Sequence, residues 1–123
     1  MAVANQRFTI YQGNKLTLDF SVVDDEGVAF SLVGYGARFA MSELDSNNDA
    51  SATPIVDKND DTPTDVAITD AGAGEVSVYL VGVDTEDLIG DYHFELEITD
   101  DADDESIVVA EGTVTVKRNI ANA

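Results

Sequence analysis

The sequence predicts an all-β domain, a sandwich of about seven antiparallel strands, on three observations. Apolar and polar residues alternate with a period of two in segment after segment, as in strands with one buried and one wet face. No segment keeps the apolar spacing of a helix beyond about two turns. The chain has 123 residues, which suits one hydrophobic core, so residues 1–123 are expected to form a single domain.

The N-terminal part of the chain shows two such segments. A first short strand is expected at Phe8–Tyr11, where Phe8 and Ile10 alternate with polar residues. In Lys15–Val23, apolar residues occupy every second position and polar residues the positions between them. One face of this second strand should therefore be core. Asp24–Gly27 then has the composition of a turn, because Gly27 can adopt a positive φ.

The middle of the chain predicts three or four more strands. Ser31–Met41 reads as a strand kinked at a glycine, and Glu43–Ser51 as a polar loop. Pro54–Lys58 is expected to be a short edge strand, because proline cannot donate to a central ladder. Val66–Thr69 and Glu75–Leu80 alternate again, and both are predicted to be strands.

The C-terminal third predicts one helical turn and two strands. Asp84–Ile89 has the pattern of a single turn of helix, with Asp84 or Thr85 as its N-cap. An acidic hairpin tip is expected at Asp100–Glu105. It leads to a last strand, Ile107–Lys117, which a glycine interrupts.

The only histidine, His93, lies in the strand between the helical turn and the acidic tip. From Tyr92 onward apolar residues alternate with polar ones, so His93 shares a face with Glu95 and Glu97. A ligand or buried histidine would be expected on the apolar face. We therefore interpret His93 as a surface residue.

Tyr92 begins this strand directly after the helical turn that contains Leu88 and after Gly90. Greek-key sandwiches place a tyrosine at this position, and its hydroxyl bonds back to the backbone. Tyr92, Leu88 and Gly90 are therefore predicted to form such a tyrosine corner, the alternative being an ordinary core tyrosine. Together with the strand count, this indicates an immunoglobulin-like sandwich.

The charge balance excludes several partners. The chain has 25 acidic and 6 basic residues and a formal net charge of −19. Phosphate backbones and anionic membrane surfaces attract clustered Lys and Arg, which are scattered here, so neither nucleic acid nor a membrane is an expected partner. No apolar run approaches the ~20 residues of a membrane helix, and no signal sequence is expected at the N-terminus. The acidity favours adaptation to high salt, the alternative being an acidic mesophilic surface.

No catalytic or metal-binding pattern is found in the sequence. There is no cysteine, and the isolated histidine lacks a nucleophile motif. Two acidic segments begin like calcium loops, but Asp45–Asp49 is followed by Ala50 and Asp57–Asp61 by Thr62 where the loop requires glycine. Calcium sites built from several loops stay possible, although solvated acidic tips are commoner. We expect a non-enzyme with no cofactor and no metal.

Five motifs in the same order resemble a known family: Ser31–Met41, Gly74–Leu80, Thr85–Leu88, Gly90–Ile98 and Glu111–Val116. They resemble the small immunoglobulin-like structural proteins of tailed viruses, and also the N-terminal domain of phage upper baseplate proteins. The chain departs from the family in its acidity, in the serine at position 31, where members usually have an acidic residue, and in the length of segment 44–64.

The resemblance implies a virion structural protein, a head decoration or a tail or baseplate connector, assembled in the host cytoplasm in multiple copies. Its implied partners are copies of itself and capsid, tail or baseplate proteins. Residues 1–6 and 118–123 are possible anchoring tails, since terminal strands of a sandwich commonly add to a neighbour. The candidate assembly contacts are Arg7, Phe8, Lys117 and Arg118. The competing hypothesis is a cellular or extracellular adhesion module with acidic, possibly calcium-binding loops.

Overall fold

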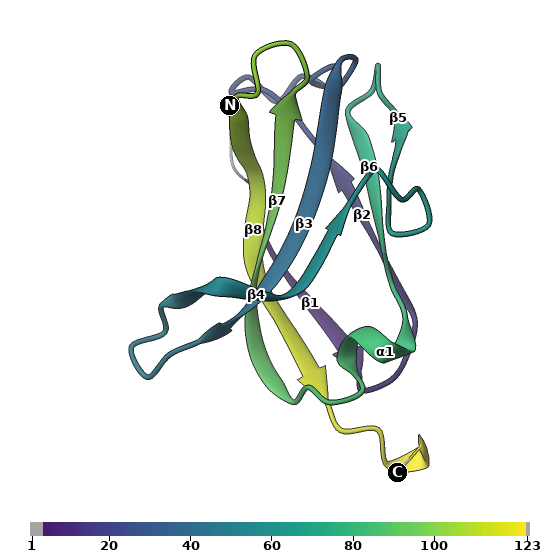
Figure 1. The fold of residues 1–123 in the computed structure, drawn as a ribbon, viewed down its shortest axis with the longest axis vertical. Helices are drawn as coiled ribbons and strands as arrows, with labels where there is room; N and C mark the ends of the chain where they lie inside the picture. The colour runs from purple at the N-terminus through teal and green to yellow at the C-terminus, as the bar shows by residue number, and fades with distance from the viewer. Residues whose placement is uncertain (1–3, 123) are drawn as a thin grey trace.

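The computed structural model describes residues 4–122 and shows two packed β-sheets (Figure 1). Within these residues there are eight strands, one short helix and a 3₁₀ turn. The elements are β1 (Ala4–Tyr11), β2 (Leu16–Ser21), β3 (Tyr35–Leu44), β4 (Ala50–Asn59), β5 (Val66–Asp70), β6 (Glu75–Leu80), α1 (Gly82–Thr85), β7 (Gly90–Asp100), β8 (Ser106–Lys117) and η1 (Ile120–Asn122).

The strands form a five-stranded sheet in the order β1-β8-β7-β3-β4 and a three-stranded sheet in the order β2-β6-β5. This is an immunoglobulin-like arrangement, in which the hairpins β3–β4, β5–β6 and β7–β8 each stay within one sheet and the other connections cross between the two layers. All pairs are antiparallel except β1 with β8, which run parallel from Ala4 opposite Ala110 to Tyr11 opposite Lys117. The predicted all-β sandwich is confirmed, with eight strands and one parallel pair.

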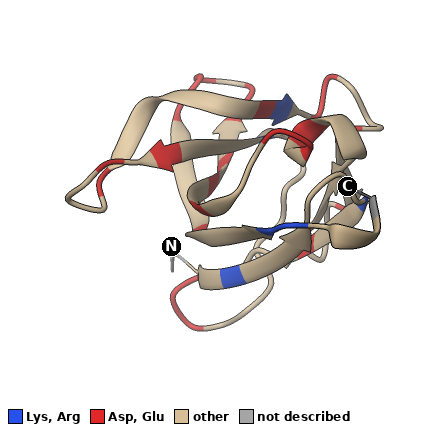
Figure 2. Ribbon diagram, turned by 90° about the horizontal axis from the view of Figure 1, so that it is seen from below, with Lys and Arg blue, Asp and Glu red and all other residues tan. Residues whose placement is uncertain are grey.

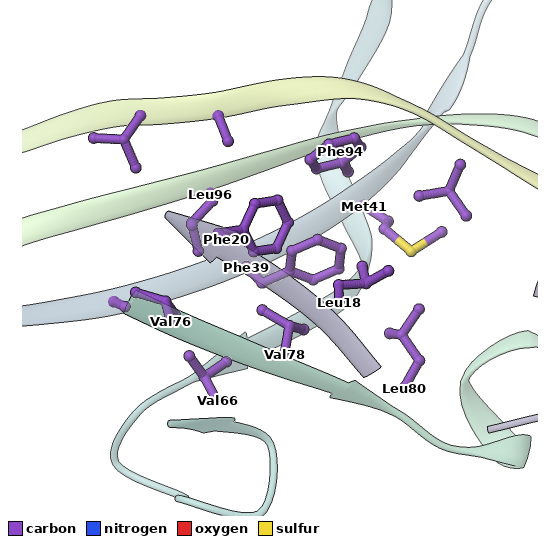
Figure 3. Close-up of a cluster of buried hydrophobic side chains, with 14 of the residues drawn as sticks. Leu18, Phe20, Phe39, Met41, Val66, Val76, Val78, Leu80, Phe94 and Leu96 are labelled. Carbon is purple, nitrogen blue, oxygen red and sulfur yellow. The ribbon is translucent and has the colours of Figure 1, made fainter. Parts of the chain in front are cut away.

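Alternation along the strands places one face of each sheet in the core, as predicted. In β2, for example, Leu18 and Phe20 are buried while Thr17 and Asp19 are exposed. Ten side chains at the centre of this core are labelled in Figure 3: Leu18, Phe20, Phe39, Met41, Val66, Val76, Val78, Leu80, Phe94 and Leu96. The Phe94 ring lies 5.8 Å from Phe39 and 6.0 Å from Phe20, so aromatic pairs join the two sheets.

The tyrosine corner is present. The Tyr92 hydroxyl donates to the Ile89 carbonyl oxygen at 3.1 Å and accepts from the Ile89 N–H at 3.1 Å. Leu88 packs against the core, and Gly90 opens β7 at φ 100°, in the region that favours glycine. These contacts fix the path from α1 into β7.

The helical turn lies earlier than predicted. It spans Gly82–Thr85, with Val81 as N-cap, and Asp84 is its third residue. The Asp84 carboxylate accepts the Val81 N–H at 2.8 Å, which is why an acidic residue suits this place. Thr85 is fully buried, and its Oγ1 accepts the Gly13 N–H at 3.1 Å, which ties α1 to the β1–β2 turn.

The limits of β1, of the β3–β4 hairpin and of the last strand differ from the prediction because backbone pairing with a neighbouring strand determines them. β1 begins at Ala4 and not at Phe8, since β8 supplies backbone partners along its whole length. The expected loop Glu43–Ser51 shrinks to a tight turn, and β3 and β4 extend into a projecting hairpin (Figure 1). The last strand runs through Gly112 without a break.

Candidate functional site

The outward face of the five-stranded sheet, called here the outer face, carries the polar half of the alternation. His93 on β7 lies opposite Ser42 on β3 and Thr113 on β8. Two residues further along β7, Glu95 lies opposite Ala40 on β3 and Glu111 on β8. His93 therefore lies on the same face as Glu95, as the alternation predicts, although neighbouring groups leave only 23% of its side chain exposed.

A groove of about 310 Å³ runs over the outer face between β7 and the projecting β3–β4 hairpin. We call it the hairpin groove. It is lined by Arg38, Ala40, Met41, Ser42, Ala50, Ser51, Ala52, Pro54, His93, Glu95 and Glu97. One side is thus built from small residues, and the other from titratable side chains of β7.

A histidine–carboxylate hydrogen bond and one ion pair lie beside the hairpin groove. His93 Nε2 lies 2.8 Å from Glu95 Oε2. Arg38 holds Asp57 in a bidentate pair, with both N–O distances at 2.8 Å. The hydrogen bond to Asp57, followed by its negative charge and with a smaller contribution from Glu97, raises the pKa of Arg38. Arg38 therefore stays cationic, and its charge is committed to Asp57.

Ser42 lies beside the histidine but forms no catalytic relay with it. Its side chain is 8% exposed and lines the hairpin groove, and in the described part of the chain its hydroxyl has no hydrogen-bond partner. A serine nucleophile needs a hydrogen bond to its base. Here His93 Nε2 is paired with Glu95, and no hydrogen bond joins Ser42 to His93. Within residues 4–122, Ser42 and His93 therefore do not form a hydrogen-bonded pair of nucleophile and base.

Three of the four predicted assembly contacts are exposed: Arg7 on β1, and Lys117 and Arg118 at the end of β8. Phe8 is the exception, because its ring turns inward and lies 5.4 Å from Phe94 and 5.7 Å from Phe20. The side chain of Phe8 is partly buried and packs against the core, and its role in assembly stays a prediction.

Of the predicted N-terminal tail, residues 1–6, the last three belong to β1 and pair with β8. Residues 1–3 lie outside the described residues. At the other end, Arg118 and Asn119 follow β8 directly, η1 covers Ile120–Asn122, and residue 123 is not described.

The chain after β8 lies against the β1–β2 turn. The Gln12 N–H donates to the Lys117 carbonyl at 2.8 Å, and Asn119 Nδ2 donates to Asn14 Oδ1 at 3.0 Å. Lys15 and Arg118 are the chain neighbours of the bonded Asn14 and Asn119, and we call the three exposed residues Lys15, Lys117 and Arg118 the basic corner. Figure 2 shows blue segments beside the C-terminus, while red segments occur around the molecule.

The cations differ in how they are paired. Lys58 and Arg38 are each held by aspartates, whereas Arg7 and the basic corner have no ion pair within residues 4–122. The sequence alone shows six scattered basic residues. Only the fold separates the two that are paired with aspartates from the four that have no ion pair within residues 4–122.

The acidic tips build their own turns. Asp24 Oδ1 accepts the N–H groups of Glu26 and Val28, and Asp45 Oδ1 accepts those of Asn47 and Asp49. Asp100 does the same with Ala102 at the β7–β8 tip. Such aspartate turns explain why the tips begin with Asp. Among the described residues, no group of three or more His, Asp or Glu side chains is arranged to hold a metal ion.

The hairpin groove was not predicted from the sequence. Its small residues Ala50 and Ser51 fall in the stretch Glu43–Ser51 that was read as a polar loop, and they line the same groove as His93 only because this stretch forms a hairpin beside the sheet. The sequence contained one sign of the groove, a serine at position 42 on the polar side of its strand. The strand register then places Ser42 opposite His93.

Residues 4–122 contain no helix that is long and apolar enough to cross a membrane. Comparison with known proteins adds no family: no protein-family model matches the sequence, and no curated protein matches it significantly.

Proposed function

We propose that the protein is a non-enzymatic structural component of a tailed-virus particle, present in several copies as a head decoration or as a tail or baseplate connector. The sequence resemblance described above supports this assignment. The observation that carries it is the position of the available cations, which lie along one edge strand and at the chain end beside it.

That edge is suited to attachment. β1 pairs with β8 on one side only, so the other side of its backbone is open to an added strand. Its outward side chains, Asn5, Arg7, Thr9 and Tyr11, are exposed. The basic corner lies at the end of the same strand pair. In a chain of net charge −19, these cations are the groups that a complementary acidic surface would attract.

The proposal is tested first by peptide mass spectrometry of purified particles, in which the intact protein is expected as a multi-copy component. Its absence would refute the virion assignment and favour the adhesion module. The attachment surface is tested by Lys117→Glu/Arg118→Glu, which should fold normally but lose incorporation. Asp103→Lys, at the distant β7–β8 tip, changes the net charge by two units in the opposite direction, against four units for the double variant, and should be incorporated. Equal incorporation of both variants would exclude the basic corner as the anchor.

The strong negative charge supports a second part of the proposal, that the particle belongs to a salt-loving host. Acidic tips lie at several loops of the structure, and at low salt their charges repel one another over long distances. The screening length falls from ~30 Å at ~0.01 M salt to ~3 Å at ~1 M salt. High salt removes most of this repulsion, so a fold with this many acidic side chains is suited to high-salt conditions.

The melting temperature is therefore expected to rise steadily from low to molar salt. NaCl and KCl should act alike, since screening depends on ionic strength and not on a specific site. Scanning calorimetry across a salt series measures this, with micromolar CaCl₂ added in parallel. A melting temperature that is independent of salt would contradict the halophilic adaptation. A sharp rise with calcium alone would show that a tip binds the ion.

A further inference from the structure

Exposed apolar side chains are found mainly at the two ends of the sandwich. Among residues 4–122, the exposed large apolar residues are Tyr11, Val28, Val33, Ile55, Val81, Val83, Ile89, Ile107 and Ile120. Ile55 lies along the side, on the edge strand β4, and Ile107 lies at the base of the β7–β8 tip. The others fall into two groups, one at each end. Single exposed apolar residues are ordinary, but a group of them marks an interaction surface.

One end, called here the C-terminal end, is built from three segments that hydrogen bonds hold together. Gln12 Nε2 donates to the Leu88 carbonyl at 3.1 Å, and Asn119 is bonded to Asn14. The β1–β2 turn, the segment 81–89 and the chain after β8 therefore lie side by side, at the bottom of Figure 1. Their exposed apolar side chains are Tyr11, Val81, Val83, Ile89 and Ile120.

The C-terminal end is also the least acidic part of this surface. It contains the basic corner, which provides three of the four cations that have no ion pair within residues 4–122. Glu86, Asp87 and Asp91 lie in the same segments, so positive and negative side chains are nearly balanced there. In a chain of net charge −19, this end therefore repels an acidic surface less than the rest of the molecule does.

The opposite end, called here the acidic end, has complementary properties. Backbone hydrogen bonds join the β2–β3 connection to the β5–β6 turn, since the Leu32 N–H donates to the Ala71 carbonyl at 2.7 Å. Val28 and Val33 are 58% and 72% exposed at this end. The turns 24–27 and 70–74 contain acidic residues and no Lys or Arg. Apolar side chains beside carboxylates fit a surface of apolar side chains beside cations.

We propose that the C-terminal end of one copy binds the acidic end of the next copy, so that copies stack end to end. The apolar side chains of the two ends pack against one another, and the basic corner faces the carboxylates of the turns 24–27 and 70–74. The two ends lie at opposite extremes of the long axis (Figure 1), so one such contact leaves an uncovered end on each copy and can repeat.

This inference rests on the proposed function for the presence of several copies, and it names the next copy as the acidic partner of the basic corner. Salt is expected to control the contact. At ~0.01 M salt the net charge of each copy opposes association, whereas at ~1 M salt the screening length of ~3 Å removes most of the repulsion. Burial of the apolar side chains does not require long-range attraction.

The test is sedimentation velocity of the purified full-length protein over a range of protein concentrations. At ~0.01 M NaCl a monomer is expected, and at ~1 M NaCl species larger than a dimer should grow with protein concentration. Growth beyond a dimer is expected because the contact joins two unlike ends.

Variants that block one end test the geometry. Val83→Asp at the C-terminal end and Val33→Asp at the acidic end should each weaken association at least about tenfold. An equimolar mixture of the two should form one-to-one dimers and nothing larger, because only one pair of intact unlike ends is left. Ile55→Asp is the matched control, since it adds the same charge away from both ends, and it should associate like the unchanged protein. Equal melting temperatures show that the variants are folded.

A protein that stays monomeric at ~1 M NaCl would overturn the proposal, as would a loss of association in Ile55→Asp equal to that of the end variants. Dimers of Val33→Asp alone would show that two C-terminal ends meet, and would overturn the contact between unlike ends. A mixture that stays monomeric would do the same. A protein that is present in particles but monomeric at ~1 M NaCl would keep the virion assignment and refute the stacking, whereas stacking of a protein absent from particles would do the reverse.

Discussion

Replacing Gly112 with alanine is expected to detach β1 from the five-stranded sheet. Gly112 lies on β8 opposite Gln6 of β1, and a Cβ at this position would overlap the backbone carbonyl of Gln6. Its φ of 155° also lies outside the range that side chains readily adopt. Because the obstacle is backbone, no side-chain rotation can relieve it.

The expected loss is about 3 kcal/mol or more, the range of substitutions that break a named structural feature. For a domain of this size it corresponds to a fall of roughly 10 °C in melting temperature. Hydrogen exchange should show the reason, with β1 amides such as Phe8 and Ile10 losing protection while β3 and β7 keep theirs. Arg7 would then leave the edge that the proposed attachment uses.

Gly72→Ala is the matched control. Gly72 lies in the β5–β6 turn, without a positive φ, and the only atom that its Cβ would approach is Asp70 Oδ1 at 3.8 Å. This substitution should change stability by less than ~0.5 kcal/mol. If the Gly112 variant melts like the control and β1 stays protected, the close approach of β1 and β8 is wrong.

Local sequence patterns predict the strands whose side chains alternate between core and solvent, but not the strand ends that pairing determines. Glu75–Leu80 was predicted residue by residue, because three apolar side chains at alternate positions all face the core. The start of β1 was not, since Ala4–Gln6 become a strand only through parallel pairing with β8. The register shifts between β3 and β4 likewise let Ala50–Thr53, all exposed, continue an edge strand.

In the candidate site, too, local patterns predict some features and pairing between strands determines the others. Tyr92 and His93 were placed correctly because a strand period fixes each residue on one face or the other. The hairpin groove escaped prediction, since Ser42 and Ala50 meet His93 only after a long hairpin bends over the sheet. The Phe8 ring points toward the core because β1 is a full strand of the five-stranded sheet.

One buried charge was missed altogether. Lys58, on β4, is only 7% exposed, and its Nζ lies 3.0 Å from Asp84 Oδ2 and 3.5 Å from Asp65 Oδ1. Asp84 is 15% exposed and also caps α1, so Lys58 links the edge of one sheet to the helix that follows the other. The sequence placed Lys58 at the end of a short edge strand and showed no partner for its charge.

Replacing Lys58 with methionine is therefore expected to destabilise the fold strongly, by about 3 kcal/mol, because it leaves the carboxylate of Asp84 half-enclosed without its cation. Methionine keeps the length and apolar stem of lysine, so packing changes little. The double variant Lys58→Met/Asp84→Asn should recover most of the loss, since no buried charge is left and asparagine can still accept the Val81 N–H.

Urea denaturation of the unchanged protein, the two single variants and the double variant gives the coupling free energy between Lys58 and Asp84. The corresponding four proteins for Arg38 and Asp57 are the matched control. Those two side chains are 48% and 46% exposed, so their coupling should be small and should vanish at ~1 M salt, whereas the coupling of Lys58 with Asp84 should persist. Two cycles with equal salt dependence would contradict the buried position of Lys58. A persistent coupling would identify the link between β4 and α1 as an electrostatic contact that molar salt leaves intact.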